Sequence, residues 1–507
     1  MGVKERFYYH VTSLNPEVTG SLHLVTVNYP DGRKTNFAVE CGSYQEGDYN
    51  DLNHKRFPFA GEHIDFVLIT HNHADHMGRL PYLVSSGFTG NIYTTDMTAC
   101  LMQPALEDSF SILKEEVRKH NKAMIYDECD LAKTLSHIQH CDFEAVQYVD
   151  RNIKVTFFMN AHILGASMIL VKISCRGEQD INLFFTGDYR SQNIFFETDE
   201  LPQWVLELPL TIITEATYGY MNRNEISYHM ENDLEKAIQE EKTVLVTVFA
   251  QGRAQEIMYM LKDMQKHGKI STKIPIKLDG KLAQEYTRMY MGCDLLEENG
   301  KNDFLPENFS FITKENREGV LQDGRQQIVL TTSGMADHGP APLYLERWIG
   351  REDVLIYIPG YTSPDTLGYK LQHPVDGMVR INNKMRSMRA KVLTTNEWSS
   401  HAKADEIIEF LNQFKKLNTV LINHGQNDVK QQFAERVLDE VNAKYVGVLG
   451  EYTFKISAYG NVKCMPSNLK CPEMEKGKWT PSSKKSKDCK KNRKKLKIPF
   501  VTRAYRR

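Results

Sequence analysis

The segment His71-Asn72-His73-Ala74-Asp75-His76 places three imidazoles and one carboxylate within six residues. It directly follows the apolar run 64–70, which predicts a buried strand. Side chains on a turn that leaves a buried strand are held rigidly, yet they stay open to a cleft, as a catalytic metal requires. A chance histidine-rich loop is the alternative, and the aspartate among the three histidines argues against it. The segment therefore predicts a metal site at the end of a strand.

The charge of the chain is unevenly distributed. Residues 476–507 hold 14 Lys or Arg and one acid, Asp488, so residues 1–475 carry 49 basic against 64 acidic residues, a net charge of −15. The basic end predicts a disordered tail. Such a tail could gather a polyanionic substrate, serve as a localisation signal or only solvate the protein. The length of 507 residues predicts about two to four domains with ample cores.

Cysteine usage and hydropathy bear on the cellular compartment. The nine cysteines show no paired spacing, which predicts reduced thiols and a cytoplasmic protein, with a nuclear location as the alternative if the source is eukaryotic. Residues 1–6 contain no apolar core of a secretion signal. No stretch approaches about 18 consecutive apolar residues, so we expect no membrane span.

The order of predicted elements indicates more than one α/β unit. Residues 7–70 read as short strands separated by turns, and helices are predicted at 78–84 and 96–121. From 208 to 390, strands alternate with helical stretches, which is the pattern of a parallel sheet flanked by helices. The chain continues over 391–441 with a further β-α-β-α series.

Later segments add to the first histidine cluster. The six-residue segment resembles the HxHxDH signature of the metallo-β-lactamase superfamily. Asn160 to Ser167, which contains His162, is similar to the third motif of that superfamily, and Thr186 to Arg190, which contains Asp188, to its fourth. A lone histidine or a Thr-Gly-Asp turn carries little weight by itself. Their order behind His76 indicates that they belong to one metal site.

A second series of segments separates the branches of the superfamily. These segments resemble the motifs of the β-CASP nucleases: Thr214 to Gly219, Val248 to Glu256, Leu278 to Ala283, Thr332 to Met335, Gly360 to Gly368, Ser400 to Ala402 (motif B) and Ile422 to Asn427 (motif C). The resemblance runs from Val18 to about Gly450. It is strongest for bacterial and archaeal β-CASP ribonucleases and for the endonuclease subunit of the eukaryotic cleavage and polyadenylation machinery.

The resemblance implies an α/β fold in which a metallo-β-lactamase αββα sandwich carries an inserted β-CASP α/β domain. The boundaries we expect are 1–207 for the first part of the metallo-β-lactamase domain, 208–390 for the β-CASP domain, 391–465 for the returning part and 466–507 for the basic tail. RNA is expected to bind in a cleft between the two domains.

By the same resemblance, seven side chains would hold two divalent metal ions. His71, His73 and His162 would bind one metal and Asp75, His76 and His424 the other, with Asp188 as the bridging ligand. Imidazole and carboxylate ligands suit Zn²⁺, and Mn²⁺ is the alternative. Two such cations lower the pKa of a shared water and neutralise charge that develops on a phosphate.

His401 and Glu215 are the remaining catalytic candidates. His401 would give a proton to the leaving ribose oxygen, because its unperturbed pKa is near working pH, and Glu215 would orient it and favour its protonated form. Two positions depart from the family pattern. Glu40 stands where the first motif normally has aspartate, so it would retune or weaken the support of the metal site. Lys403 stands where motif B normally has an acid, and the next acid is Asp405, which predicts a shifted helix start.

The resemblance implies a metal-dependent ribonuclease, because a histidine such as His424 at motif C is typical of the RNA-directed members. The expected reaction is endonucleolytic hydrolysis that leaves 3′-hydroxyl and 5′-phosphate ends, with 5′–3′ exonuclease activity as a further option. The alternatives are a catalytically weak RNA-processing scaffold, a DNA-directed β-CASP nuclease and a small-molecule hydrolase. RNA is the expected partner, and a homodimer or an RNA-processing complex is compatible with the resemblance.

Candidates for phosphate binding are less specific. Arg253, in the turn Gln251-Gly252-Arg253, and the pair Ser333 and Gly334 could present donors to a phosphate of the substrate. A tight structural turn explains each of these sequences equally well.

Overall fold

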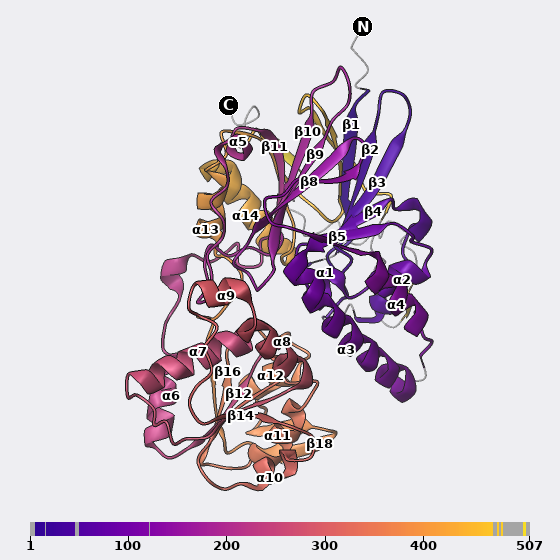
Figure 1. Cartoon of the computed structure of the whole chain (residues 1–507). Helices are drawn as coiled ribbons and strands as arrows, with labels where there is room; N and C mark the ends of the chain where they lie inside the picture. Colours follow the sequence, from indigo (N-terminus) through magenta and orange to yellow (C-terminus); the bar gives the residue numbers. More distant parts are fainter. Residues whose placement is uncertain are drawn as a thin grey trace, which may run out of the picture. The chain divides into compact units, whose positions relative to one another are not determined.

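The computed structural model describes residues 6–15, 17–45, 50–120 and 122–469, and the strand segments 474–475, 478–479 and 500–502. By its internal contacts the chain forms two units (Figure 1). Unit 1 consists of Met1–Ser191, Glu197–Arg223 and His401–Arg507, and unit 2 of Gln192–Phe196 and Asn224–Ser400.

Unit 1 is built on two eight-stranded sheets. The first has the order β23-β22-β1-β2-β3-β4-β5-β6, which are Val462–Pro466, Tyr452–Ser457, Tyr8–Ser13, His23–Asn28, Lys34–Val39, Phe66–Leu68, Asn91–Thr95 and Ile138–Cys141. The second has the order β26-β21-β20-β11-β10-β9-β8-β7, which are Phe500–Thr502, Tyr445–Val448, Lys416–Ile422, Pro209–Thr214, Ile181–Phe185, Ser167–Ile173, Ile153–Met159 and Gln147–Asp150.

The two sheets pack face to face, and helices cover their outer faces. Successive side chains of a strand point to opposite faces. Phe157 therefore lies in the core shared by both sheets, whereas Phe158 packs against α13 (Ala404–Leu411) and α14 (Asn427–Glu440). On the other side, α3 (Asp96–His120) contacts β5 and β6, and α2 (Leu80–Ser85) contacts α4 (Glu128–His137). This helix–sheet–sheet–helix order confirms the predicted αββα sandwich.

Unit 2 is built on one six-stranded sheet in which all paired strands are parallel. Its order is β14-β13-β15-β12-β16-β19, which are Phe309–Ile312, Ile276–Asp279, Ile328–Thr331, Thr243–Thr247, Val354–Ile358 and Lys391–Thr394. The helices of this unit are α6 (Met230–Gln239), α7 (Arg253–Lys266), α8 (Lys281–Met291), α9 (Asp294–Glu298), α10 (Arg317–Gln322), α11 (Ala341–Trp348) and α12 (Leu367–Gln372). The parallel sheet confirms the prediction from the alternating pattern.

The boundaries between the units differ from the predicted ones at both ends of the insertion. We predicted an inserted domain over 208–390, but β11 pairs in parallel with β10 and β20 of unit 1, and β19 pairs with β16 of unit 2. The units instead divide after Arg223 and after Ser400. The alternation of strands and helices in the sequence continues across both boundaries between the units. The pattern therefore does not reveal which sheet a strand joins.

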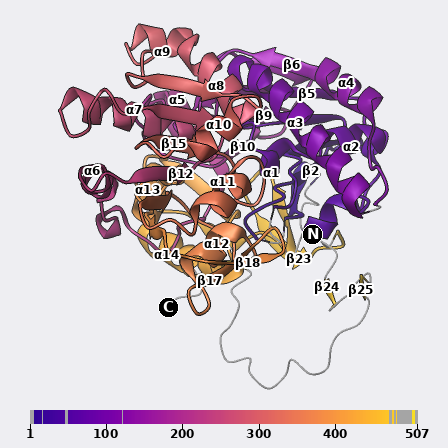
Figure 2. The same ribbon diagram turned by 90° about the horizontal axis from the view of Figure 1, so that it is seen from below.

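Most of the predicted basic tail, 466–507, lies outside the described residues, including its lysines between 484 and 497. Within that range, β24 (Met474–Glu475) pairs with β25 (Lys478–Trp479), as Figure 2 shows, and β26 pairs with β21. The role of the tail stays a prediction. Among the residues that the structure describes, no helix is long and apolar enough to cross a bilayer.

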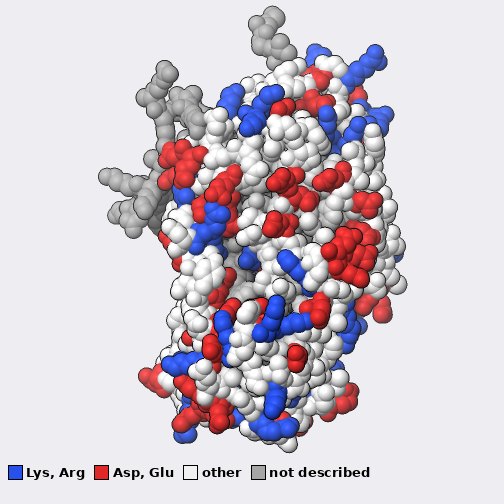
Figure 3. Space-filling view, turned by 60° about the vertical axis from the view of Figure 1, so that its left-hand side comes forward, with Lys and Arg blue, Asp and Glu red and all other residues white. Residues whose placement is uncertain are grey.

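The surface charge agrees with the acidic balance of residues 1–475. On the face that Figure 3 shows, acidic side chains gather in several groups, and Lys and Arg lie between them.

Candidate metal centre

The six-residue histidine segment follows β4, as predicted, and leads into the short helix α1 (Ala74–Met77). Gly42 packs so closely against this turn that a Cβ there would lie 1.6 Å from the carbonyl oxygen of Asp75. The backbone N–H of Cys41 donates to the carbonyl oxygen of His76 at 2.7 Å. Position 42 therefore requires glycine, and the loop that carries the first four predicted ligands is tied to the end of β3.

Asn160 connects the two loops that carry the next predicted ligands. Its side-chain amide donates to the carbonyl oxygens of Thr186 at 2.9 Å and Asp188 at 2.6 Å, and its Oδ1 accepts from the backbone N–H of His162 at 2.9 Å. The buried Asn160 thus sets the spacing between His162 and Asp188. The role of Asn160 was not predicted, although an asparagine two positions before an isolated histidine at a strand end could have indicated it.

A first group of ligand atoms comes from His71, His73, His162 and Asp188, which all lie within 4.8 Å of one another. His73 Nδ1 lies 3.2 Å from His71 Nε2 and 3.1 Å from His162 Nε2. Asp188 Oδ2 lies 3.7 Å from both of those Nε2 atoms. Three imidazole nitrogens and one carboxylate oxygen in this arrangement are a donor set that suits a four-coordinate cation such as Zn²⁺.

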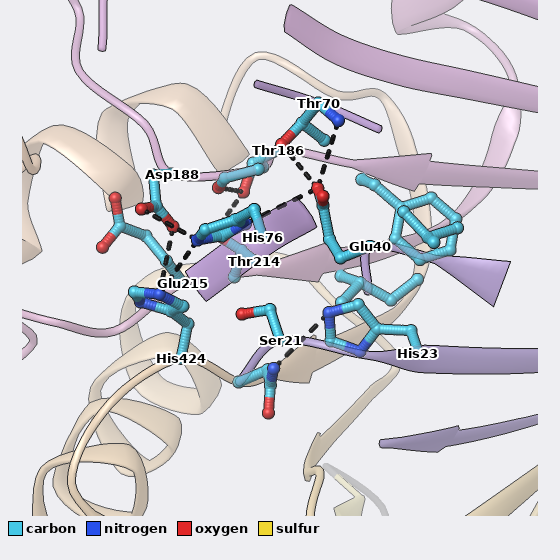
Figure 4. A pocket seen from close by; sticks show the side chains of 15 residues that line it. Ser21, His23, Glu40, Thr70, His76, Thr186, Asp188, Thr214, Glu215 and His424 are labelled. Carbon is cyan, nitrogen blue, oxygen red and sulfur yellow. Dashed lines mark hydrogen bonds and ion pairs between the residues drawn. The ribbon is translucent and has the colours of Figure 1, made fainter. Parts of the chain in front are cut away.

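A second group comes from Asp75, His76 and His424. His424 Nε2 lies 3.2 Å from His76 Nε2 and 3.7 Å from Asp75 Oδ2. Asp188 also borders this group, because its Oδ2 lies 3.2 Å from His76 Nε2 and its Oδ1 lies 3.4 Å from His424 Nε2 (Figure 4). One carboxylate thus contacts both groups, which is the position of a bridging ligand.

His424 and Glu40 are held in a backbone conformation that side chains rarely adopt, with φ of 46° for His424 and 67° for Glu40. Such strained residues persist where their surroundings fix them, and they cluster at functional sites. The ring of His424 is fixed by Thr217, whose Oγ1 lies 3.0 Å from His424 Nδ1. Thr217 was not predicted as a site residue, because its partner is 207 positions away in the sequence.

Glu40 contacts His76 of the second group directly and reaches His71 of the first group through Thr70. Its Oε1 atom accepts hydrogen bonds from Thr70 Oγ1 at 2.5 Å and Thr70 N at 3.2 Å, and it lies 3.6 Å from His76 Nδ1. Thr70 Oγ1 in turn lies 2.9 Å from His71 Nδ1. Figure 4 shows Glu40 on the side of His76 opposite to Asp188. The longer side chain thus supports the ring of His76 and, through Thr70, that of His71.

His401 and Glu215 form the predicted pair. His401 Nδ1 lies 2.9 Å from Glu215 Oε2, and Glu215 Oε1 accepts from the backbone N–H of Tyr189 at 2.6 Å. Burial disfavours the charged imidazole, but the carboxylates of Glu215 and Asp188 outweigh it and raise the pKa of His401. His401 Nδ1 lies 3.9 Å from Asp188 Oδ2, so the pair borders the metal-binding groups.

The carboxylates of Asp188 and Asp75 are ionised in this environment. Burial alone would raise the pKa of Asp188, but the imidazoles of His424 and His76 hold it well below its usual range. His76 has the same effect on Asp75, whose pKa is lowered to about 2 against the effect of burial. Burial lowers the pKa of His73 to about 4, so its imidazole is neutral. Against the effect of burial, the carboxylates of Asp188 and Asp75 raise the pKa of His76 well above its usual value. Metals bind ionised carboxylates and neutral imidazoles, so a metal at His76 would displace a proton.

The predicted phosphate-binding residues all lie in unit 2, in loops with internal contacts. The buried guanidinium of Arg253 donates to the carbonyl oxygen of Pro359 at 3.1 Å. Ser333 Oγ accepts from the backbone N–H of His338 at 3.3 Å. Gly334 packs against the ring of Phe249. Substrate binding by Arg253, Ser333 and Gly334 stays a prediction.

The departure at motif B has a structural explanation. Helix α13 begins at Ala404, and the backbone N–H of Lys403 donates to Glu406 Oε2 at 3.0 Å. Glu406 therefore caps the helix from within its first turn. Lys403 Nζ lies 3.6 Å from the centre of the Tyr218 ring. The start of α13 is thus capped by Glu406, although position 403 holds a lysine.

Two sheets enclosed by helices, with clustered histidines and aspartates at the ends of their strands, define an enzyme of the metallo-β-lactamase type. Three family models match the chain: the metallo-β-lactamase superfamily over residues 34–99, the Beta-Casp domain over 254–371 and the Zn-dependent metallo-hydrolase RNA specificity domain over 386–446. The chain belongs to the β-CASP family of the metallo-β-lactamase superfamily.

Relatives from all three domains of life match most of the chain. A transcription termination factor FttA of Methanosarcina mazei is 28% identical over 79% of this chain and 64% of its own length. Ribonuclease TTHA0252 of Thermus thermophilus is 28% identical over 81% of this chain and 91% of its own length. Subunit 3-I of the cleavage and polyadenylation specificity factor of Arabidopsis thaliana is 26% identical over 81% of this chain and 59% of its own length. The chain spans 63–66% of the length of the first archaeal factors it matches.

Proposed function

We propose that this protein is a metal-dependent ribonuclease that hydrolyses phosphodiester bonds of RNA. The observation that carries the proposal is the position of Asp188, whose two carboxylate oxygens border both groups of imidazole ligands. A centre with one shared carboxylate suits two cations close together, which is a recurring arrangement in nucleases and phosphatases.

The residues present fit such cations. His71, His73 and His162 would hold one metal, Asp75, His76 and His424 the other, and Asp188 both. Asp188 Oδ1 is buried and accepts no hydrogen bond within the described part of the chain, so a cation would satisfy it. Zn²⁺ suits this donor set best, with Mn²⁺ as the alternative. When bound, the cations activate water as the nucleophile and offset charge that develops on the phosphate.

His401 would supply the proton that the leaving group needs. Its Nδ1 is paired with Glu215, so Nε2 is the ring nitrogen that would exchange a proton with the substrate. Glu215 is itself fixed by the backbone of Tyr189 and would keep His401 oriented and protonated. We propose that the proton goes to the 3′-oxygen of the upstream ribose, which leaves a 3′-hydroxyl upstream and a 5′-phosphate downstream.

RNA is favoured over DNA by two observations. His424 lies within the second ligand group, and a histidine at this position is typical of the RNA-directed branch. The RNA specificity domain matches residues 386–446, which contain both His401 and His424, and one relative is named a ribonuclease. Endonucleolytic cleavage, 5′–3′ exonuclease activity, a cytoplasmic location, a homodimer and an RNA-processing complex stay predictions.

The proposal is tested by incubating the purified protein with RNA labelled at either end and with DNA of the same sequence. We expect internal cleavage of RNA, products with 3′-hydroxyl and 5′-phosphate ends, and much slower cleavage of DNA. Faster cleavage of DNA would favour the DNA-directed alternative. Binding of RNA without cleavage in the presence of Zn²⁺ or Mn²⁺ would favour the scaffold.

Metal content gives a prediction that does not depend on activity. After removal of metal with a chelator and reconstitution with Zn²⁺, elemental analysis should find about two ions per chain. The variant His63→Ala, which removes an exposed histidine outside the centre, should bind the same amount. The absence of bound metal in the reconstituted wild-type protein would contradict the proposed function.

Glu40 gives a second prediction. Glu40→Gln keeps an oxygen that can accept from Thr70 but removes the charge beside His76, so we expect metal affinity to fall by about 10- to 100-fold. Glu40→Asp keeps the charge and should have a smaller effect. Competition with a metal-binding dye measures both affinities. An unchanged affinity of Glu40→Gln would show that Glu40 does not support the centre.

A further inference from the structure

We propose that Phe249 is a stacking platform for a nucleobase of single-stranded RNA on unit 2. The inference rests on the proposed function, because it names how part of the RNA would be held. It concerns only the surface of unit 2 that is formed by the loops after β12, β15 and β16.

Phe249 lies where a parallel sheet usually binds ligands. It follows β12, which is paired on one side with β15 and on the other with β16. The loop after β15 contains Gly334, and the loop after β16 contains Gly360. In open parallel sheets, ligands bind at the carboxyl ends of the strands. The ring is thus at the edge of unit 2 where a ligand is expected.

Gly334 leaves room for the ring, and Gly360 lies beside it. A Cβ at Gly334 would lie 2.8 Å from Cδ2 and Cε2 of Phe249, and a Cβ at Gly360 would lie 3.9 Å from Cε2. The loop is fixed further by Thr247 Oγ1, which donates to the carbonyl oxygen of Gly334 at 3.2 Å. The ring therefore packs against the loop at Gly334, where a side chain would displace it.

The side chain of Phe249 is nevertheless exposed to solvent. It is 38% exposed, and it is the one phenylalanine among the exposed large hydrophobic side chains in the described part of the chain. Tyr361, which follows Gly360, is 51% exposed. A rigid apolar ring that is held open to solvent costs free energy, and a ligand with a flat apolar face would recover it.

A nucleobase is the ligand that fits this feature in an RNA-cleaving enzyme. Bases of single-stranded RNA stack on aromatic side chains, and this contact tolerates any base because each has a π-face. A stacking contact also needs no positive charge, so it is compatible with the net charge of −15 carried by residues 1–475, with 49 basic and 64 acidic residues. We therefore expect Phe249 to contribute affinity without strong sequence preference.

The test measures RNA binding in the Asp188→Asn background, so that substrate is not consumed. Phe249→Ala should weaken binding of a single-stranded RNA by roughly 5- to 150-fold. Phe249→Trp should restore the affinity, and its new tryptophan fluorescence should be quenched by RNA. Tyr459→Ala, which removes an aromatic ring that is 61% exposed on unit 1, is the matched control and should change the affinity little.

Two further measurements separate stacking from other roles. Phe249→Ala should have no effect on binding of an oligomer in which abasic sites replace the bases. Gly334→Ala should displace the ring and weaken binding, but it should add nothing to Phe249→Ala, because the ring is then already gone. An additive loss would instead indicate that the loop around Gly334 contacts the phosphates and would overturn the inference.

The outcomes distinguish the inference from the proposed function. If the wild-type protein cleaves RNA and Phe249→Ala binds RNA as tightly as its Asp188→Asn parent, the platform is wrong and the nuclease assignment stands. If the wild-type protein neither cleaves nor binds RNA, the proposed function is wrong and the inference falls with it.

Discussion

Asp188→Asn is expected to lower the rate of RNA cleavage by roughly 10³-fold or more, since loss of metal ions removes several kcal/mol of transition-state stabilisation. The carboxylate lies 3.2 Å from His76 Nε2 and 3.4 Å from His424 Nε2, and it borders the first group as well. An amide has nearly the same size but no charge, and its nitrogen cannot bind a cation. The protein should therefore lose at least one of its two metal ions.

The fold should survive this substitution. The contacts of Asn160 go to the backbone oxygen of Asp188, which the variant retains. Asp180→Asn is a matched control. Asp180 directly precedes β10, the strand that Asp188 follows, and it pairs with Lys172 at 2.9 Å on the surface. Exposed pairs of this kind contribute about 1 kcal/mol or less, so the control should keep its rate and metal. Wild-type rate and metal content in Asp188→Asn would exclude the shared carboxylate as a ligand.

The grouping of the proposed ligands could largely be predicted from the sequence, because each of these side chains is at a strand end in a short motif. The segment 71–76 places four side chains on one loop, and a loop of this length leaves them little freedom to separate. His162, Asp188 and His424 each follow a strand of the second sheet, so the order of strands brings them to one place. The structure gathers all seven predicted side chains into two adjoining groups.

The boundary between the units, Thr217 and Phe249 could not be predicted, because each depends on contacts between residues that are far apart in the sequence. The first boundary between the units was misplaced because β11 reads like any buried strand, and only its pairing with β10 and β20 assigns it to unit 1. Thr217 was not predicted as a site residue because its partner His424 is also distant in the sequence. Phe249 reads as part of an apolar strand end, whereas its exposure and its contact with Gly334 become visible only when the loops after β12 and β15 lie together.

The second large effect is expected for His401→Ala, which should slow cleavage by about 10²- to 10⁴-fold. The variant should keep the metal content of the wild-type protein. Its Nδ1 lies 2.9 Å from Glu215 and 3.9 Å from Asp188, so the geometry alone would also allow His401 to act as a ligand of a metal held by Asp188 and His424. Metal analysis separates the two roles, because a proton donor can be removed without loss of metal. His424→Ala, by contrast, should lose metal as well as rate.

The leaving group gives a sharper test of the proton transfer. A substrate in which sulfur replaces the 3′-bridging oxygen at the cleaved bond releases a thiolate, which needs no proton at neutral pH. His401→Ala should cleave this substrate at nearly the wild-type rate, whereas Asp188→Asn should remain slow on it. Glu215→Gln should fall between the wild type and His401→Ala on ordinary RNA, because it leaves the imidazole in place but removes the charge that orients and protonates it. If sulfur substitution does not rescue His401→Ala, the residue acts in another step, such as orienting the phosphate, and the leaving oxygen receives its proton from elsewhere.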